Sequence, residues 1–234
     1  MTKRLRPFFS YFGSKYTLAP RYPAPIIGHQ IIEPFAGSAG YSTYYPHYEV
    51  ILCDISEVIC GVWEYLINVS EQELLSLPML SPGEDIPHTL IDEARAFIGF
   101  WCQKANTNPA QRKRNTNWNA NKPMCDWSEQ IRARTARQLQ YIRHWKVQCT
   151  SYDLIDTTCA TYFVDPPYQS QGHRYANNFN DHQKLYNWCK NLNGQVIVCE
   201  NTDADWLNNA TIIGTSNGVL RKTTEVFELI QNYH

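Results

Sequence analysis

Residues 32–40 of the chain are Ile32-Glu33-Pro34-Phe35-Ala36-Gly37-Ser38-Ala39-Gly40, a short apolar strand that runs into a turn of small residues and then a predicted helix. Small side chains in such a turn let a ligand lie against the backbone at the carboxyl end of the strand. The next apolar segment ends at Asp54, whose carboxylate can accept hydrogen bonds from ribose hydroxyls. This order predicts a nucleoside site. The turn lacks the G-x-G-x-x-G spacing of a dinucleotide site, and taken alone its glycines are better explained as those of an ordinary turn.

Seven compact apolar segments, flanked by Gly, Asn, Asp or Pro, predict the strands of one sheet. They are residues 30–33, 49–54, 146–152, 161–165, 195–200, 210–214 and 225–231. Helical patterns fall between several of them, at 56–69 and at 181–192, where Asp181 is the expected N-cap. This alternation predicts an α/β fold with a mostly parallel sheet. The last two strands are joined by a short polar connection, so we expect an antiparallel last strand.

The alternation stops between about Val69 and Trp145, where two helical patterns and no strand pattern occur. We therefore predict a catalytic domain of residues 1–69 and 146–234 with a mainly helical inserted module, residues 70–145. Asp126 and Glu129 have the spacing of a capping box. From residue 104 to residue 146 the charge is +8, although the whole chain has a net charge of −1. A basic module in an acidic body suits a polyanion such as nucleic acid, and a solvated helix face is an equally good explanation.

A second decisive stretch is Tyr162-Phe163-Val164-Asp165-Pro166-Pro167-Tyr168, at the end of the fourth predicted strand. Two consecutive prolines cannot continue an inner strand, so they fix a stiff, extended loop. This loop presents a carboxylate, the Pro166 carbonyl and an aromatic ring. These groups suit an amino group on a planar base, because Asp165 and the Pro166 carbonyl accept its two hydrogens while Tyr168 stacks on the ring.

The glycine turn and the Asp-Pro-Pro-Tyr motif, in this order and with an insertion between them, resemble the Dam-like (D12 class) DNA adenine methyltransferases. The segments 7–15, 151–153, 199–201 and 224–229 are similar to further motifs of that family. The resemblance implies a Rossmann-like class I methyltransferase fold, S-adenosyl-L-methionine as cofactor and methylation of adenine N6 in a specific sequence of double-stranded DNA. The catalytic residues are then Asp165, Pro166 and Tyr168. The cofactor-binding residues are Tyr11, Lys15, Glu33, Phe35, Ala36, Gly37, Gly40, Asp54, Asp153 and Asp165.

In this interpretation the base is flipped out of the duplex, and the amine attacks the methyl group directly. The expected DNA contacts are basic residues of the insertion and of the loop after the Asp-Pro-Pro-Tyr motif, namely Arg112, Arg114, Arg132, Arg143 and Arg174. The insertion lacks the hairpin that family members specific for GATC carry, so the resemblance does not extend to GATC specificity and leaves the recognition sequence open.

Two alternatives remain: a methyltransferase acting on another planar amine (cytosine N4, RNA adenine or protein glutamine), and a catalytically idle DNA-binding protein. The cysteines are scattered singly without a C-x-x-C pair, which argues against a metal site and favours buried thiols in a reducing compartment. No apolar run is long enough for a membrane helix. The first residues lack the apolar region of a signal peptide, so we expect a cytoplasmic protein, in a bacterial cell or a phage-infected host.

Overall fold

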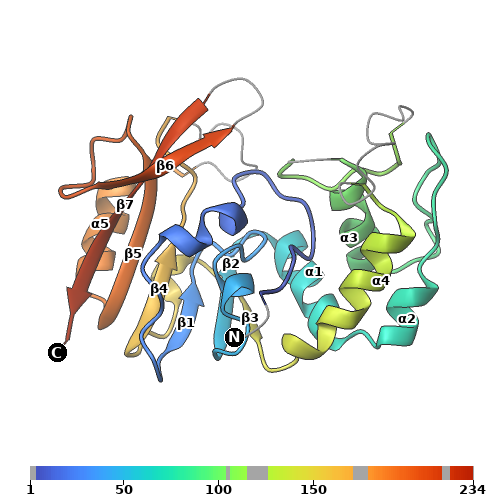
Figure 1. Ribbon diagram of the computed structural model, residues 1–234, viewed down its shortest axis with the longest axis horizontal. Coiled ribbons are helices and arrows are strands. Elements are labelled where there is room, and N and C mark those ends of the chain that lie inside the picture. Colours follow the sequence, from blue (N-terminus) through green and yellow to red (C-terminus); the bar gives the residue numbers. More distant parts are fainter. Residues whose placement is uncertain (1–3, 104–105, 115–125, 171–178, 218–221, 234) are drawn as a thin grey trace.

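The computed structural model describes residues 4–103, 106–114, 126–170, 179–217 and 222–233 (Figure 1). Its centre is a seven-stranded sheet with the order β3-β2-β1-β4-β5-β7-β6. The strands are β1 (Gln30–Glu33), β2 (Val50–Asp54), β3 (Lys146–Cys149), β4 (Ala160–Val164), β5 (Gly194–Asn201), β6 (Thr211–Asn217) and β7 (Lys222–Asn232). The five strands from β3 to β5 are parallel, whereas β7 is antiparallel to both β5 and β6. The predicted α/β class, with its mostly parallel sheet and antiparallel last strand, is confirmed.

The strand order reverses at β1, which pairs with β2 on one side and with β4 on the other. In an open α/β sheet, a ligand crevice forms outside the carboxyl ends of the strands at such a reversal. The glycine turn follows β1 and the Asp-Pro-Pro-Tyr loop follows β4. The topology therefore brings the two sequence motifs to one edge of the sheet.

Helices α1 (Glu57–Asn68) and α5 (His182–Lys190) belong to the sheet domain. Ser56 caps α1 through a hydrogen bond from the Ile59 N–H, and the apolar face of this helix, including Trp63, is buried. Asp181 caps α5 by accepting from the Lys184 N–H at 2.9 Å, as the sequence predicts. The helix expected after Gly40 is only the 3-10 turn η3 (Ser42–Tyr44). The predicted helix is thus this single 3-10 turn, and the N-terminal segment packs against the glycines that precede it.

The described part of the insertion contains α2 (Glu71–Ser76), α3 (Asp92–Cys102) and α4 (Glu129–Gln138), gathered at one end of the molecule in Figure 1. Its β pairing, within the residues described, is the single bridge between Asp85 and Arg112. The predicted capping box of Asp126 and Glu129 is wrong, since Ser128 is the N-cap of α4. Helix α3 packs on α1, and one buried apolar cluster spans both regions, from Phe163 of the sheet to Trp127 of the insertion. The remaining short 3-10 helices are η1 (Lys15–Thr17), η2 (Ala19–Arg21), η5 (Leu139–Tyr141) and η6 (Tyr152–Leu154).

Gly194 at the start of β5 provides a test of the β4–β5 pairing. Its φ is +120°, and a Cβ there would lie 2.9 Å from the Ala160 nitrogen and still nearer to the Ala160 carbonyl oxygen. Gly28 has a comparable φ of +84° but no atom within 4 Å of an added Cβ. We expect Gly28→Ala to cost about 1–2 kcal/mol from the φ alone. Gly194→Ala should lower the free energy of unfolding, measured in urea, clearly more than Gly28→Ala, because β4 and β5 must also move apart. An equal loss of unfolding free energy in the two variants would mean that the close approach of Gly194 to Ala160 does not constrain the sheet.

Candidate functional site

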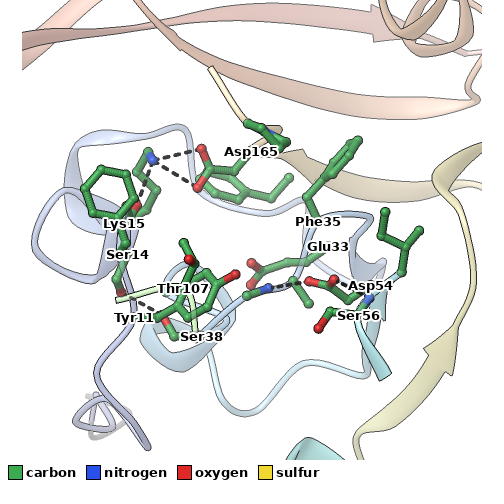
Figure 2. A pocket seen from close by; sticks show the side chains of 18 of the residues that line it. Tyr11, Ser14, Lys15, Glu33, Phe35, Ser38, Asp54, Ser56, Thr107 and Asp165 are labelled. Atoms are coloured by element: carbon green, nitrogen blue, oxygen red, sulfur yellow. Dashed lines mark hydrogen bonds and ion pairs between the residues drawn. The ribbon is translucent and has the colours of Figure 1, made fainter. Parts of the chain in front are cut away.

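A pocket opens at the carboxyl ends of β1, β2 and β4, and Figure 2 shows it from close by. It is walled by the N-terminal segment, the turn after β1, the residues after β2, the loop after β4 and a short piece of the insertion. The lining residues are Tyr11, Phe12, Gly13, Ser14, Lys15, Glu33, Phe35, Ala36, Gly37, Ser38, Gly40, Asp54, Ile55, Ser56, Thr107, Asn108, Phe163, Asp165, Pro167 and Phe179.

The glycines of the first turn permit close packing of the N-terminal segment. A Cβ on Gly37, whose φ is +45°, would lie 2.9 Å from the Tyr11 ring, and one on Gly40 would lie 2.8 Å from the backbone nitrogen of Lys15. Ala39, between them, adopts a positive φ of 48° without being a glycine. Such backbone strain persists where the surrounding structure enforces it, and it concentrates at functional sites. The glycines thus do more than make a turn, since they seat one wall of the pocket.

Glu33 ends β1 and points into this turn. Its Oε1 accepts a hydrogen bond from the Ser42 N–H at 2.7 Å, and its side chain is buried. Burial raises the pKa of Glu33 to about 8, because a carboxylate loses its hydration in the interior. Near neutral pH the protonated form is therefore favoured. A cation beside Glu33 would reverse that preference.

Asp54 ends β2, as predicted, and faces the same pocket (Figure 2). Its two oxygens accept hydrogen bonds from the backbone N–H groups of Gly37, at 3.1 Å, and Ser56, at 2.9 Å. Burial raises its pKa, and these hydrogen bonds partly oppose the rise. Each carboxylate oxygen keeps further acceptor capacity. The fixed carboxylate is therefore suited to bind the hydroxyls of a ribose.

Lys15 and Asp165 form an ion pair across the site, as the dashed lines in Figure 2 mark. The Lys15 Nζ lies 2.8 Å from Oδ1 and 2.9 Å from Oδ2 of Asp165, the latter with hydrogen-bond geometry, and 2.8 Å from the Gly13 carbonyl oxygen. It also lies 4.6 Å from the centroid of the Tyr168 ring. Burial raises the pKa of Asp165 to about 6 although Lys15 opposes the shift, so the carboxylate is ionised at neutral pH.

The rest of the Asp-Pro-Pro-Tyr loop is held from behind by two buried glutamates. The Tyr168 hydroxyl donates to Oε2 of Glu225 at 2.5 Å, and the Gln169 N–H donates to Oε2 of Glu200 at 2.9 Å. Pro166 and Tyr168 are buried and are not among the residues that line the pocket, whereas Asp165 and Pro167 are. The aromatic ring is thus fixed in orientation beneath the Lys15 ammonium.

All the residues predicted to bind a cofactor line this pocket except Asp153. Asp153 lies in η6, where it accepts from the Lys184 Nζ at 2.7 Å and from the Ser151 hydroxyl at 2.6 Å. These bonds lower its pKa. The sequence analysis missed several lining residues. Ile55 and Ser56 could have been found because they follow Asp54 directly, whereas Thr107 and Asn108 come from the insertion and carry no recognisable signal.

The arginines predicted to contact DNA are found in different environments. Arg143 donates to the carbonyl oxygens of Ile67 and, at 2.5 Å, Val69, beyond the end of α1. Arg132 donates to the carbonyl oxygen of Leu77 at 2.5 Å, after α2. Both therefore have a structural role that the sequence did not reveal. Arg112 and Arg114 are exposed, with Arg112 paired at 2.8 Å to Asp85, and Arg174 lies outside the described residues.

The strand order, together with a pocket that combines a glycine turn and a ribose-type carboxylate, defines an α/β protein with the architecture of Rossmann-like class I methyltransferases. The model of the D12 class N6 adenine-specific DNA methyltransferase family matches residues 11–98. This match confirms the family resemblance that the motifs predict, and it supports a DNA adenine methyltransferase.

A solved structure described as a conserved hypothetical protein of Streptococcus pyogenes is 10% identical, with 91% of each chain covered and a TM-score of 0.38. We draw no inference from so distant a likeness. None of the curated proteins compared with the chain matches it. Across the described residues, no helix is long and apolar enough to span a membrane, and no group of three or more His, Cys, Asp or Glu side chains is placed to hold a metal ion.

The raised pKa of Glu33 leads to a prediction about stability. A carboxyl whose pKa is about 8 in the folded protein and about 4.5 otherwise binds more protons when folded, so the free energy of unfolding falls as pH rises through that window. Gln at this position keeps an acceptor for the Ser42 N–H but does not titrate. We expect the Tm of Glu33→Gln to equal that of the native protein near pH 5 and to exceed it by at least about 2 °C at pH 8.

Glu73→Gln is the matched control. Glu73 lies at the exposed start of α2, where bonds from Ser70 lower its pKa, so this change should not raise the Tm at pH 8. A Tm of Glu33→Gln that is lower than the native value at pH 8 would show that the Glu33 carboxylate stabilises the free protein.

Proposed function

We propose that the protein is a cytoplasmic enzyme that transfers the methyl group of S-adenosyl-L-methionine to N6 of adenine in a specific sequence of double-stranded DNA. The observation that carries the proposal best is the charge of the pocket. Three carboxylates line it, those of Glu33, Asp54 and Asp165, and Lys15 is the one basic side chain among its described lining residues. Lys15 is already paired with Asp165, and Glu33 is protonated near neutral pH, so the described lining offers no spare basic group for the anionic pyrophosphate of a dinucleotide. A cationic nucleoside derivative fits this charge.

S-adenosyl-L-methionine combines a ribose, an ammonium group and an electrophilic methyl group on a positively charged sulfur. The residues present suit each part. Asp54 is fixed to accept ribose hydroxyls, and Glu33 is a buried carboxylate that accepts from the Ser42 N–H while Lys15 acts on it only through its charge. Phe35 and Phe179, whose ring centroids are 5.6 Å apart, offer apolar surface at the pocket wall. Binding of a cation would favour the ionised form of Glu33 and release its proton.

The amine acceptor would be held by the loop after β4. The lone pair of adenine N6 is delocalised into the ring, so the amine is a poor nucleophile. Hydrogen bonds from its two hydrogens to Asp165 and to the Pro166 carbonyl favour a pyramidal nitrogen whose lone pair is free to react, a geometry that belongs to the transition state. Asp165 is ionised at neutral pH and can therefore accept such a bond. Glu225 fixes the ring plane of Tyr168 for stacking.

Lys15 has to yield part of this site to the base. Its ammonium donates to Oδ2 of Asp165, while Oδ1 has no hydrogen-bond partner among the described residues, and it covers the ring of Tyr168, which is only 8% exposed. Oδ1 of Asp165 therefore keeps acceptor capacity for an incoming amine, whereas a base can stack on Tyr168 only when Lys15 withdraws from the ring. While the base is absent, Lys15 keeps the buried carboxylate neutralised. We therefore assign Lys15 as a positioning residue for Asp165.

The main test is mass spectrometry of nucleosides from unmethylated DNA incubated with S-adenosyl-L-methionine and the protein. We expect N6-methyladenine with the native protein and a loss of at least about 100-fold with Asp165→Ala, because the amine loses its charged acceptor. Glu73→Gln, at the exposed start of α2 and outside the pocket, should retain activity. Formation of N4-methylcytosine would show that the acceptor is cytosine and not adenine. Cofactor binding without any methylated base would favour an RNA substrate, a protein glutamine substrate or an idle DNA-binding protein.

The two kinds of arginine in the insertion can be separated experimentally. Arg143→Ala should lower the Tm by roughly 3–8 °C, since two carbonyl oxygens lose a charged donor. Arg112→Ala should leave the Tm unchanged, because exposed ion pairs contribute little, but should weaken binding to duplex DNA and reduce the salt slope by about 0.9. Fluorescence anisotropy at several salt concentrations measures this. An unchanged affinity of Arg112→Ala for duplex DNA would show that Arg112 does not contact DNA.

A further inference from the structure

A short piece of the insertion, residues 106–108, reaches back to the pocket. The Asn106 carbonyl oxygen accepts a hydrogen bond from the Phe12 N–H at 3.3 Å, and the Asn106 side chain accepts from the Thr107 N–H at 2.9 Å. Thr107 and Asn108 then line the pocket beside the N-terminal segment. In Figure 2, Thr107 lies next to Tyr11 and Ser38. The insertion therefore forms part of the pocket wall.

Helix α3 holds this piece in place through a close backbone approach. The Ala110 N–H donates to the Gly99 carbonyl oxygen at 3.2 Å. A Cβ on Gly99 would lie 2.9 Å from Pro109 Cβ and nearer still to the Ala110 carbonyl oxygen. Residues 109–110 can therefore pack on α3 only because residue 99 has no side chain. The position of Asn108 depends on this contact, since it immediately precedes Pro109.

Thr107 lies on the side of the pocket away from Asp54 and Ser56 (Figure 2). If Asp54 binds the ribose, the groups near Thr107 meet the other end of the same ligand. Polar groups gather there, among them Ser14 and Ser38, whose hydroxyls are 2.8 Å apart. Asn108 is exposed and carries an amide, which donates to a carboxylate and accepts from an ammonium group. This chemistry suits the amino-acid end of the cofactor.

We propose that Thr107 and Asn108 bind the amino-acid end of S-adenosyl-L-methionine, so that the insertion completes the cofactor site. The proposal rests on the proposed function. It has a consequence for DNA binding, because the same stretch of chain continues into Arg112 and Arg114. Lys113 fastens that continuation by donating to the carbonyl oxygens of Leu80 and Trp127, each at 3.0 Å. Cofactor and DNA would thus contact one segment, and any effect of one on the affinity of the other would be reciprocal.

The test is isothermal titration calorimetry with two probes, S-adenosylhomocysteine and adenosine. Adenosine contains the ribose but lacks the amino-acid end. We expect Asn108→Ala and Gly99→Ala each to lower the affinity for S-adenosylhomocysteine about five- to tenfold and to leave the affinity for adenosine at the native value. Asn108→Ala changes an exposed side chain and should leave the fold intact, which keeps the test valid if Gly99→Ala unfolds.

Gly61→Ala is the matched control for Gly99→Ala. Gly61 lies on α1 facing α3, and an added Cβ there would meet the flexible Glu93 side chain at 3.1 Å and no backbone atom within 4 Å. We expect Gly61→Ala to bind S-adenosylhomocysteine and adenosine with the native affinities. Equal weakening of both probes by Asn108→Ala, or native affinity of that variant for S-adenosylhomocysteine, would overturn the proposal. Failure of the native protein itself to bind S-adenosylhomocysteine would instead overturn the proposed cofactor.

Discussion

The ion pair between Lys15 and Asp165 joins two parts of the chain that are 150 residues apart, and the site depends on it. A lysine that is 5% exposed loses most of its hydration, so it needs the carboxylate and the Gly13 carbonyl as replacements. The pair can form only because Gly40 leaves room for the backbone of Lys15. The N-terminal segment, the turn after β1 and the loop after β4 are therefore parts of one arrangement.

A pocket with several buried carboxylates is costly for a folded protein. Desolvation raises the pKa of Glu33 to about 8 and that of Asp165 to about 6, and these two values differ for a reason. Lys15 is in direct contact with Asp165, whereas Glu33 relies mainly on the hydrogen bond from Ser42. Near neutral pH Asp165 is thus ionised while Glu33 holds a proton. Under the proposed function the first would accept an amine, and a bound cation would displace the proton of the second. Such opposed tuning of neighbouring groups is typical of functional sites and is a poor choice for stability alone.

The sequence predicts those features that depend on local pattern. Buried strands alternate with helices, and the residues at strand ends, Glu33, Asp54 and Asp165, meet because parallel strands end at one edge. Features that depend on long-range packing were missed. Arg143 and Arg132 were predicted to contact DNA because they lie in a basic segment. Their guanidinium groups instead donate to carbonyl oxygens after helices α1 and α2, and no sequence periodicity reveals such contacts. Asp153 was assigned through family resemblance, yet Lys184 holds it outside the pocket lining. Thr107 and Asn108 are near the pocket only because Gly99 admits their segment.

The insertion and the catalytic sheet are mechanically connected rather than merely joined in sequence. The Trp101 indole of α3 donates to the Phe8 carbonyl oxygen at 2.8 Å, and Arg134 of α4 donates to that of Pro7, also at 2.8 Å. Phe9 stacks on Phe100 with ring centroids 5.1 Å apart. All three contacts hold the segment that continues to Lys15. Any displacement of the insertion by DNA would therefore act on the chain that carries the lysine. Under the proposed function Lys15 must withdraw from the Tyr168 ring before a base can stack there, so this connection would offer a physical route from DNA binding to the opening of the site.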